Sequence, residues 1–216
     1  SSSIAEQNNC EMCAKGQYQD KKGKTLCSAC IPGKYQTEKE QVDCIPCGVG
    51  RYADTPKTED NRTRCGEGEF ESESGSTSCL ECLPGSHQKH EEQTHCIECG
   101  VGRSSETPKT QGNCTKCEEG EYQPDEGATS CLYCIPGQYQ SQEGQINCTE
   151  CEVGRASPDV GNKNECDACL GGTYQVEQGA TACLYCIPGQ YQTKENQANC
   201  ALCPVGRASL EKNAST

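Results

Sequence analysis

Apolar residues recur along this chain in short units rather than in long runs. Eleven Cys-x2-Cys pairs begin at steps of 17, 17 and 18 residues, and a glycine follows each second cysteine after three residues. In eight of twelve units Tyr or Phe stands two residues after that glycine, as at Tyr18 and Phe70. Glycine, proline and cysteine interrupt every unit, so we expect strands of two or three residues in small hairpins and almost no helix.

Three kinds of unit alternate and define a longer repeat of 52 residues. The middle unit carries Ile or Leu and then Pro before its glycine, and the third unit reads Val-Gly-Arg. A fixed period predicts a stack of equivalent units, here an elongated linear rod of twelve units of about 17 residues in which each unit contacts only its neighbours. The expected parts are a lead-in at 1–9 and blocks at 10–61, 62–113, 114–165 and 166–216, the last incomplete at its end.

The composition excludes a conventional hydrophobic core. The chain has 23 cysteines in 216 residues, no Trp, one Phe and one Met, and a net charge of −13. Low hydrophobicity with high net charge normally indicates disorder. Disulfides reverse that expectation, since each bridge that closes a loop of about 15 residues contributes about 3 kcal/mol in the chain-entropy model. Such bridges need an oxidising compartment, so we expect a secreted or cell-surface protein.

Cys-x2-Cys pairs are also typical of zinc sites, but disulfides fit this sequence better. A zinc site takes four ligands, and 23 cysteines do not divide by four. Spacing alone leaves the connectivity open. A bridge inside each pair closes a very small ring of the kind found in redox centres, and eleven redox centres in one chain are implausible. We therefore favour a bond from the second cysteine of each pair to the first cysteine of the next.

That scheme gives ten disulfides and leaves three cysteines over. Cys47 is left because Arg62 stands where its partner is expected, and Cys10 and Cys203 expect partners outside the chain, as in a longer array. Alternatively, Cys203 of one molecule bonds to Cys10 of the next. The ten expected pairs are Cys13–Cys27, Cys30–Cys44, Cys65–Cys79, Cys82–Cys96, Cys99–Cys114, Cys117–Cys131, Cys134–Cys148, Cys151–Cys166, Cys169–Cys183 and Cys186–Cys200.

The run Cys-x2-Cys-x2-Gly-x-Tyr-x8-Cys, as from Cys10 to Cys27, resembles the ephrin-receptor-like cysteine-rich repeat. The stretch from Cys13 to Cys27 is also similar to the first half-module of tumour-necrosis-factor-receptor cysteine-rich domains, in which the implied bridge joins the same two cysteines. Long arrays of such repeats resemble protist surface proteins, including ciliate surface antigens and the shaft proteins of flagellar hairs. The strict 52-residue period differs from receptor ectodomains, which mix modules, and favours a structural filament or coat.

Four Asn-x-Ser/Thr sequons predict N-linked glycans on a secreted chain. Two of them carry cysteine in the middle position, which lowers their expected occupancy. The alternative interpretation is that asparagine here only favours turns. The four asparagines are Asn61, Asn113, Asn147 and Asn213.

Candidate metal and catalytic residues are few. His87, His90 and His95 lie together beside Glu91 and Glu92, a spacing that permits a metal site. His87 nevertheless occupies the position of a tyrosine in other blocks, so variation at a repeat position explains the histidines better. The acidic stretches at 67–73 and 118–126 lack the spacing of an EF-hand. No nucleophile–base motif is present, and we expect no enzyme activity, no metal and no cofactor.

Two function classes remain. The first is an extracellular structural protein that assembles with itself into a filament, appendage or coat. The second is a receptor or adhesion ectodomain that binds a protein ligand. The acidic balance argues against nucleic acid and against anionic membrane surfaces, and no apolar run is long enough to insert in a membrane. The arginines of the third units are expected to stack on aromatic rings or to pair with acidic side chains of a neighbouring unit, and they are Arg51, Arg103, Arg155 and Arg207.

Overall fold

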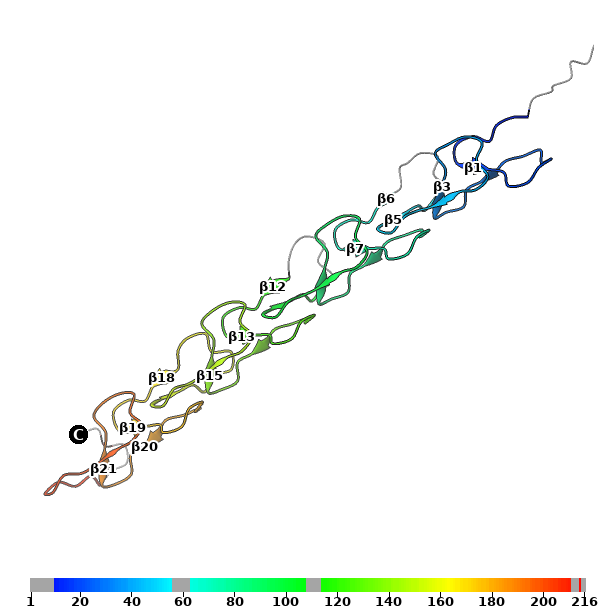
Figure 1. Ribbon diagram of the computed structural model, residues 1–216. Coiled ribbons are helices and arrows are strands. Elements are labelled where there is room, and N and C mark those ends of the chain that lie inside the picture. Colours follow the sequence, from blue (N-terminus) through cyan, green and yellow to red (C-terminus); the bar gives the residue numbers. More distant parts are fainter. Residues whose placement is uncertain (1–9, 56–62, 108–113, 211–213, 215–216) are drawn as a thin grey trace, which may run out of the picture. The chain divides into compact units, whose positions relative to one another are not determined.

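The fold consists of two-stranded hairpins held by disulfides. The computed structural model describes residues 10–55, 63–107, 114–210 and 214. Within these residues there are 22 strands of two residues each and no helix (Figure 1). Every strand pairs with one other strand into a separate sheet. The prediction of small disulfide-rich repeats with short hairpins is therefore confirmed.

Each hairpin joins two consecutive units. The two residues after the glycine of one unit pair with the two residues between the cysteines of the next, as in Gln138↔Glu150 and Tyr139↔Thr149. The hairpins are β1 (Gln17–Tyr18) with β2 (Ser28–Ala29), β3 (Lys34–Tyr35) with β4 (Ile45–Pro46), β5 (Arg51–Tyr52) with β6 (Thr63–Arg64), β7 (Glu69–Phe70) with β8 (Leu80–Glu81), β9 (Ser86–His87) with β10 (Ile97–Glu98), β11 (Arg103–Ser104) with β12 (Thr115–Lys116), β13 (Glu121–Tyr122) with β14 (Leu132–Tyr133), β15 (Gln138–Tyr139) with β16 (Thr149–Glu150), β17 (Arg155–Ala156) with β18 (Asp167–Ala168), β19 (Thr173–Tyr174) with β20 (Leu184–Tyr185), and β21 (Gln190–Tyr191) with β22 (Ala201–Leu202).

The contacts divide the chain into two compact parts. The first part comprises Ser1–Leu83, His87–Ile97 and Pro108–Asn113, and the second comprises Pro84–Ser86, Glu98–Thr107 and Cys114–Thr216. In both parts cysteine dominates the buried apolar residues. The first part also contains a small cluster of Tyr35, Cys47 and Ala53. The interior is thus built from sulfur and backbone instead of large aliphatic side chains.

Backbone hydrogen bonds connect consecutive units in a fixed pattern. At one junction of the second part, the amide of Gly137 donates to the carbonyl of Ser157 at 2.8 Å, and the amide of Gly161 donates to the carbonyl of Cys134 at 2.8 Å. A third bond runs from the Gln140 amide to the Asn162 carbonyl at 3.0 Å. The same positions are bonded at other junctions, for example Gly50 to Glu71 and Glu92 to Cys65 in the first part. Because backbone groups supply these bonds, units with different side chains stack in the same way.

Units also contact the unit two places further on, so the expectation of contacts between neighbours alone is wrong. A methyl group built on Gly137 would stand 2.0 Å from the carbonyl oxygen of Gly179, and one on Gly33 would stand 2.0 Å from that of Gly75. In both cases the glycine lies against the turn of the unit two places further along the chain. Glycine is required at Gly33 and Gly137 for this approach and for the positive φ, which is 82° and 85°.

Candidate functional site

Ten disulfides form the first candidate site, and they join the ten pairs of cysteines named above. Their Cα–Cα distances are 5.5–5.8 Å, within the usual range, and each closes a span of 14 or 15 residues. The remaining cysteines differ in burial: Cys10 is exposed, Cys203 is half-buried and Cys47 is buried. Cys10 and Cys203 are therefore the accessible thiols among the described residues.

A glutamine clamps the loop that each of seven disulfides closes, and its side chain is buried in five of the seven loops and half-buried at Gln19 and Gln192. In the 134–148 loop, the Gln140 side chain is 8% exposed; its Nε2 donates to the Asn147 carbonyl at 2.9 Å and its Oε1 accepts from the Gln142 amide at 3.0 Å. Both ends of the loop are thus tied to one amide group. The same two bonds are made by Gln19, Gln36, Gln88, Gln123, Gln175 and Gln192.

Sequence reasoning missed these glutamines, although a signal was present. Seven glutamines follow directly after the residue at the aromatic position, as in Tyr139-Gln140. Glu71 replaces one of them and keeps one bond, in which its Oε1 accepts from the Glu73 amide at 2.9 Å. The recurrence of glutamine at this position was the signal, and the backbone of the loop supplies the partners that a buried amide needs.

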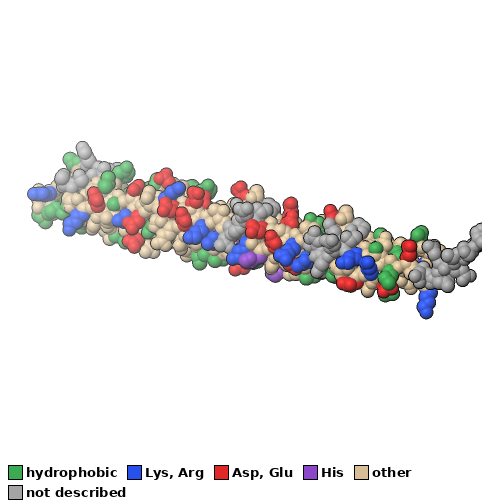
Figure 2. All heavy atoms as spheres, turned by 90° about the horizontal axis from the view of Figure 1, so that it is seen from above, with side chains coloured by type: hydrophobic (Ala, Val, Ile, Leu, Met, Phe, Trp, Pro, Cys, Tyr) green, Lys and Arg blue, Asp and Glu red, His purple; other side chains and the backbone are tan. Residues whose placement is uncertain are grey.

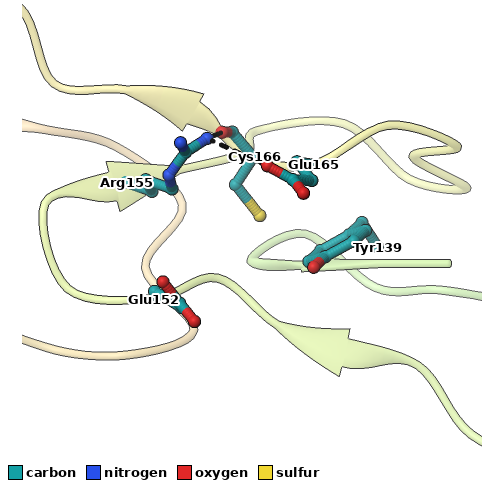
Figure 3. A pocket seen from close by; sticks show the side chains of 5 residues that line it. All are labelled: Tyr139, Glu152, Arg155, Glu165 and Cys166. Atoms are coloured by element: carbon teal, nitrogen blue, oxygen red, sulfur yellow. Dashed lines mark hydrogen bonds and ion pairs between the residues drawn. The ribbon is translucent and has the colours of Figure 1, made fainter. Parts of the chain in front are cut away.

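One arginine of a third unit, Arg155, lines a small pocket. Arg155, at the start of β17, donates from Nη1 to the Cys166 carbonyl at 2.7 Å and lies 3.6 Å from the Glu165 carboxylate. These residues, with Tyr139 and Glu152, surround about 80 Å³ (Figure 3). Tyr139 therefore lies beside the Cys151–Cys166 bridge and is half-buried. The pocket is large enough for a few water molecules and is too small for an organic substrate.

The expectation for these arginines needs correction. Arg103 and Arg155 donate to the carbonyl of the first cysteine of the next unit, Cys114 and Cys166, at 2.8 and 2.7 Å. Arg51 instead pairs with Glu92, at 2.5 Å and two units away. A backbone carbonyl was not foreseen as the acceptor, because sequence patterns carry no information about main-chain groups left available at a junction.

An ion cluster of two arginines and two glutamates lies near the place in the sequence where the cysteine pattern is broken. Arg62, which breaks the pattern, is outside the described residues. Glu92 accepts from Arg51 at 2.5 Å and lies 3.4 Å from Arg64, and Arg64 lies 3.7 Å from Glu91. Glu92 has a φ of 62°, at a turn position that is glycine in many units. A glutamate in this conformation is strained, and its carboxylate links arginines of two other units.

A second pocket lies one block further along the chain. It encloses about 410 Å³, and its residues Tyr191, Pro204 and Arg207 correspond to Tyr139, Glu152 and Arg155 of the first pocket. Cys203 lines it and corresponds to Cys151 of the Cys151–Cys166 disulfide. The full lining is Tyr191, Thr193, Cys203, Pro204, Arg207 and Ala208.

The three histidines do not form a metal site. His87 is buried in β9, the amide of His90 donates to Gln88 Oε1, and the His95 carbonyl accepts from Gln88 Nε2. No group of His, Cys, Asp and Glu that could hold a metal ion occurs among the described residues. His90 and His95 take part in the glutamine clamp through their backbones.

Of the four predicted glycosylation sites, the structure describes Asn147 alone. Asn147 is exposed and immediately precedes Cys148, and Thr149 of its sequon is exposed in β16. Glycosylation of Asn147 stays a prediction. Asn61, Asn113 and Asn213 lie outside the described residues.

The surface mixes charged and apolar side chains. In the face drawn in Figure 2, acidic and basic groups alternate with small apolar groups. Leu132, Tyr133 and Ile135 are 45–61% exposed, and Leu184, Tyr185 and Ile187 repeat them one block later at 47–60%. Among the described residues, no helix has the length and hydrophobicity of a membrane span.

Comparison with known proteins identifies the module. The family model described as tyrosine-protein kinase ephrin type A/B receptor-like matches residues 1–32, 21–65, 68–113 and 176–216. The chain belongs to this ephrin-receptor-like family. No curated protein matches the chain. Ephrin-receptor-like repeats are disulfide-rich modules of an extracellular, non-catalytic type, and the resemblance stated from the sequence is thereby confirmed.

Proposed function

We propose that this ephrin-receptor-like chain is a non-catalytic structural protein that builds or coats an extracellular filament, appendage or cell surface by assembly with itself. The observation that carries the proposal is the repeated junction. Backbone bonds of the same kind join unit after unit, as from Gly137 to Ser157 and from Gly154 to Gln175. A junction made by backbone places no demand on individual side chains, and it suits a protein that extends by repetition.

The sites described above also fit a structural role. The Arg155 pocket is small and its arginine is already bonded to Cys166 and Glu165. The buried glutamines serve the loops that contain them. The net charge of −13 opposes unspecific aggregation, so an assembly has to rest on specific contacts.

A receptor or adhesion role is the second candidate, and one observation favours it. The exposed triplet of Leu132, Tyr133 and Ile135 recurs in the next block as Leu184, Tyr185 and Ile187. Exposed tyrosine with aliphatic neighbours is typical of the centre of a protein interface. A protein ligand of this kind would bind at several equivalent positions, whereas a single receptor site needs one distinctive block.

Electron microscopy of the native material tests the proposal. We expect ordered fibres or a regular coat, disrupted when the disulfides are reduced. Dispersed single particles in native material, together with stoichiometric capture of a soluble protein ligand that Tyr133→Ser and Tyr185→Ser abolish, would replace the structural role with the receptor role.

A further inference from the structure

The second part of the chain exposes the same apolar patch twice, 52 residues apart. The side chains of the first patch are 45–61% exposed and those of the second patch are 47–60% exposed. The sequence around them, Cys-Leu-Tyr-Cys-Ile-Pro-Gly-Gln-Tyr-Gln, is identical at 131–140 and 183–192. The first patch consists of Leu132, Tyr133 and Ile135, and the second patch consists of Leu184, Tyr185 and Ile187.

Disulfides hold both patches in place. Two residues of the first patch lie between Cys131 and Cys134, which bond to Cys117 and Cys148. The ring of Tyr133 also rests against a turn, since its Cδ1 is 3.1 Å from a methyl group built on Gly161. Because these side chains are already fixed by the fold, a partner that covers them loses little conformational entropy in ordering them.

The two patches face the same side of the second part. Figure 1 shows β13 and β19 in the same orientation, one block apart. The patch strands β14 and β20 pair with them in the same register, Tyr133 opposite Glu121 and Tyr185 opposite Thr173. One extended partner can therefore cover both patches.

A second copy of this chain has the surface that such a partner needs. The partner must carry two apolar surfaces at the spacing set by the 52-residue period, and another copy carries them by construction. Leucine, isoleucine and tyrosine side chains pack well against their own kind in the centre of an interface. Two arrangements cover all four patches: a parallel pair, in which each patch meets its equal, and an antiparallel pair, in which the first patch of each copy meets the second patch of the other.

Charge distinguishes the two arrangements. The segment around the first patch, 118–152, has eight acidic residues and no basic residue, whereas the equivalent segment 170–204 has two acidic residues and one basic residue. The residue paired with the patch tyrosine follows the same difference, Glu121 in the first patch and Thr173 in the second. A parallel pair sets the two acidic segments against each other, which like-charge repulsion opposes. An antiparallel pair sets each acidic segment against a nearly neutral one.

The exposed area also favours an arrangement that uses both patches. A half-exposed side chain of this size offers on the order of 100 Å², so the six side chains offer on the order of 600 Å² per copy. Stable complexes bury about 800 Å² per partner. A contact that joins only one patch of each copy buries half as much apolar surface, so the antiparallel pair is the arrangement that both area and charge support.

We propose that two copies of this chain pair antiparallel through these patches, with Tyr133 of each copy against Tyr185 of the other. The contact is isologous, because the same surface of each copy takes part. The proposal rests on the proposed structural function and names a lateral surface for the assembly.

Sedimentation equilibrium of the oxidised chain, with accessible thiols alkylated, tests the pair. We expect a monomer–dimer equilibrium. Leu132→Ser/Leu184→Ser should weaken it by about tenfold or more, because it removes apolar area at every contact. Leu26→Ser/Val42→Ser removes two side chains that are 81% and 68% exposed in the first part, and it should leave the dimer unchanged. A chain that stays monomeric, or equal weakening by both double variants, would overturn the proposal.

A photoreactive side chain tests the antiparallel arrangement. With Tyr133→p-benzoylphenylalanine, irradiation should give a cross-linked dimer in which position 133 is joined to residues 183–187 of the other copy. The control Leu26→p-benzoylphenylalanine should give no dimer. Cross-links from position 133 to residues 131–135 of the other copy, or an open series of larger species in place of a dimer, would overturn the antiparallel pair.

The variant Leu132→Ser/Leu184→Ser also separates this proposal from the structural function. Ordered fibres or a regular coat formed by this variant with unchanged spacing would keep the structural role and reject the pair. A dimer with the expected cross-link, together with native material that contains no fibre or coat, would keep the pair and reject the structural role.

Discussion

Gly137 lies so close to Gly179 that a methyl group on Gly137 would stand 2.0 Å from the Gly179 carbonyl oxygen. The two glycines belong to units that are two places apart. Gly189 has the same neighbours in sequence, Ile-Pro-Gly-Gln-Tyr-Gln, and a φ of 86°, yet nothing lies within 4 Å of its built methyl group. The chain thus contains the same motif in a packed and in an open setting.

Alanine substitution at these two glycines should have different effects. Both changes force a side chain into the left-handed region, at a cost of about 1–2 kcal/mol. Gly137→Ala also meets backbone of Gly179, which adds about 1–3 kcal/mol. Local opening free energies from hydrogen exchange should be well below the Gly189→Ala value in Gly137→Ala. Equal losses of local opening free energy in the two variants would contradict the packing between units that are two places apart.

Removing a glutamine clamp should loosen one loop. Gln140→Leu deletes the bonds to the Asn147 carbonyl and the Gln142 amide and should cost about 1–3 kcal/mol, since each bond contributes about 0.5–1.5 kcal/mol. Hydrogen exchange in the 134–148 loop measures the loss. Gln142→Ala, an exposed glutamine two residues away, is the control and should change exchange little. The clamp has no stabilising role if both variants behave alike.

The ion cluster of the first part should be weak and sensitive to salt. Glu92→Ala keeps the positive φ but removes both arginine contacts, and the side chains of Arg51 and Glu92 are 20% and 37% exposed. Partly exposed pairs contribute up to about 1 kcal/mol. Denaturant unfolding should show that loss at low salt and a smaller one at about 1 M salt, where the Debye length is about 3 Å. Glu91→Ala removes one contact, at 3.7 Å, and should lower the free energy of unfolding by less. If salt does not reduce the loss of stability in Glu92→Ala, the loss comes from packing and not from the ion pairs.

Asn147 should carry an N-linked glycan when the chain is made in a eukaryotic secretory pathway. Its side chain is exposed, and Thr149 provides the sequon hydroxyl. Asn147→Gln and Thr149→Ala should both remove one endoglycosidase-sensitive mass increment, and Thr149→Ser should keep it. An unchanged mass in all three variants would show that Asn147 carries no glycan.

Most of the fold could be predicted from the regular spacing of the cysteines. Apolar side chains are too few to form a core, so the spacing of cysteines and glycines determined the hairpins and predicted a nearly helix-free chain. The division into four blocks stays a description of the sequence. The self-assembly and glycan partners stay predictions.

The period did not predict what connects the units. The contact of Gly137 with Gly179 depends on how far the chain rises between units, and no residue pattern encodes that distance. The acceptors of Arg103 and Arg155 are backbone carbonyls, which are identical in every residue. The role of Gln140 was visible as a recurring glutamine, but a polar residue at a repeat position suggests exposure until its burial is known.

Hydrogen exchange before and after full reduction tests the central claim, that sulfur bridges and not an apolar core hold this chain in shape. The amides of Gly137 and Gly154 report on the junctions because both are bonded across them. With a metal chelator present throughout, we expect these amides to be protected in the oxidised protein and to exchange at unfolded rates once a phosphine has reduced the ten disulfides. Protection that survives complete reduction, or that the chelator alone removes, would contradict the account.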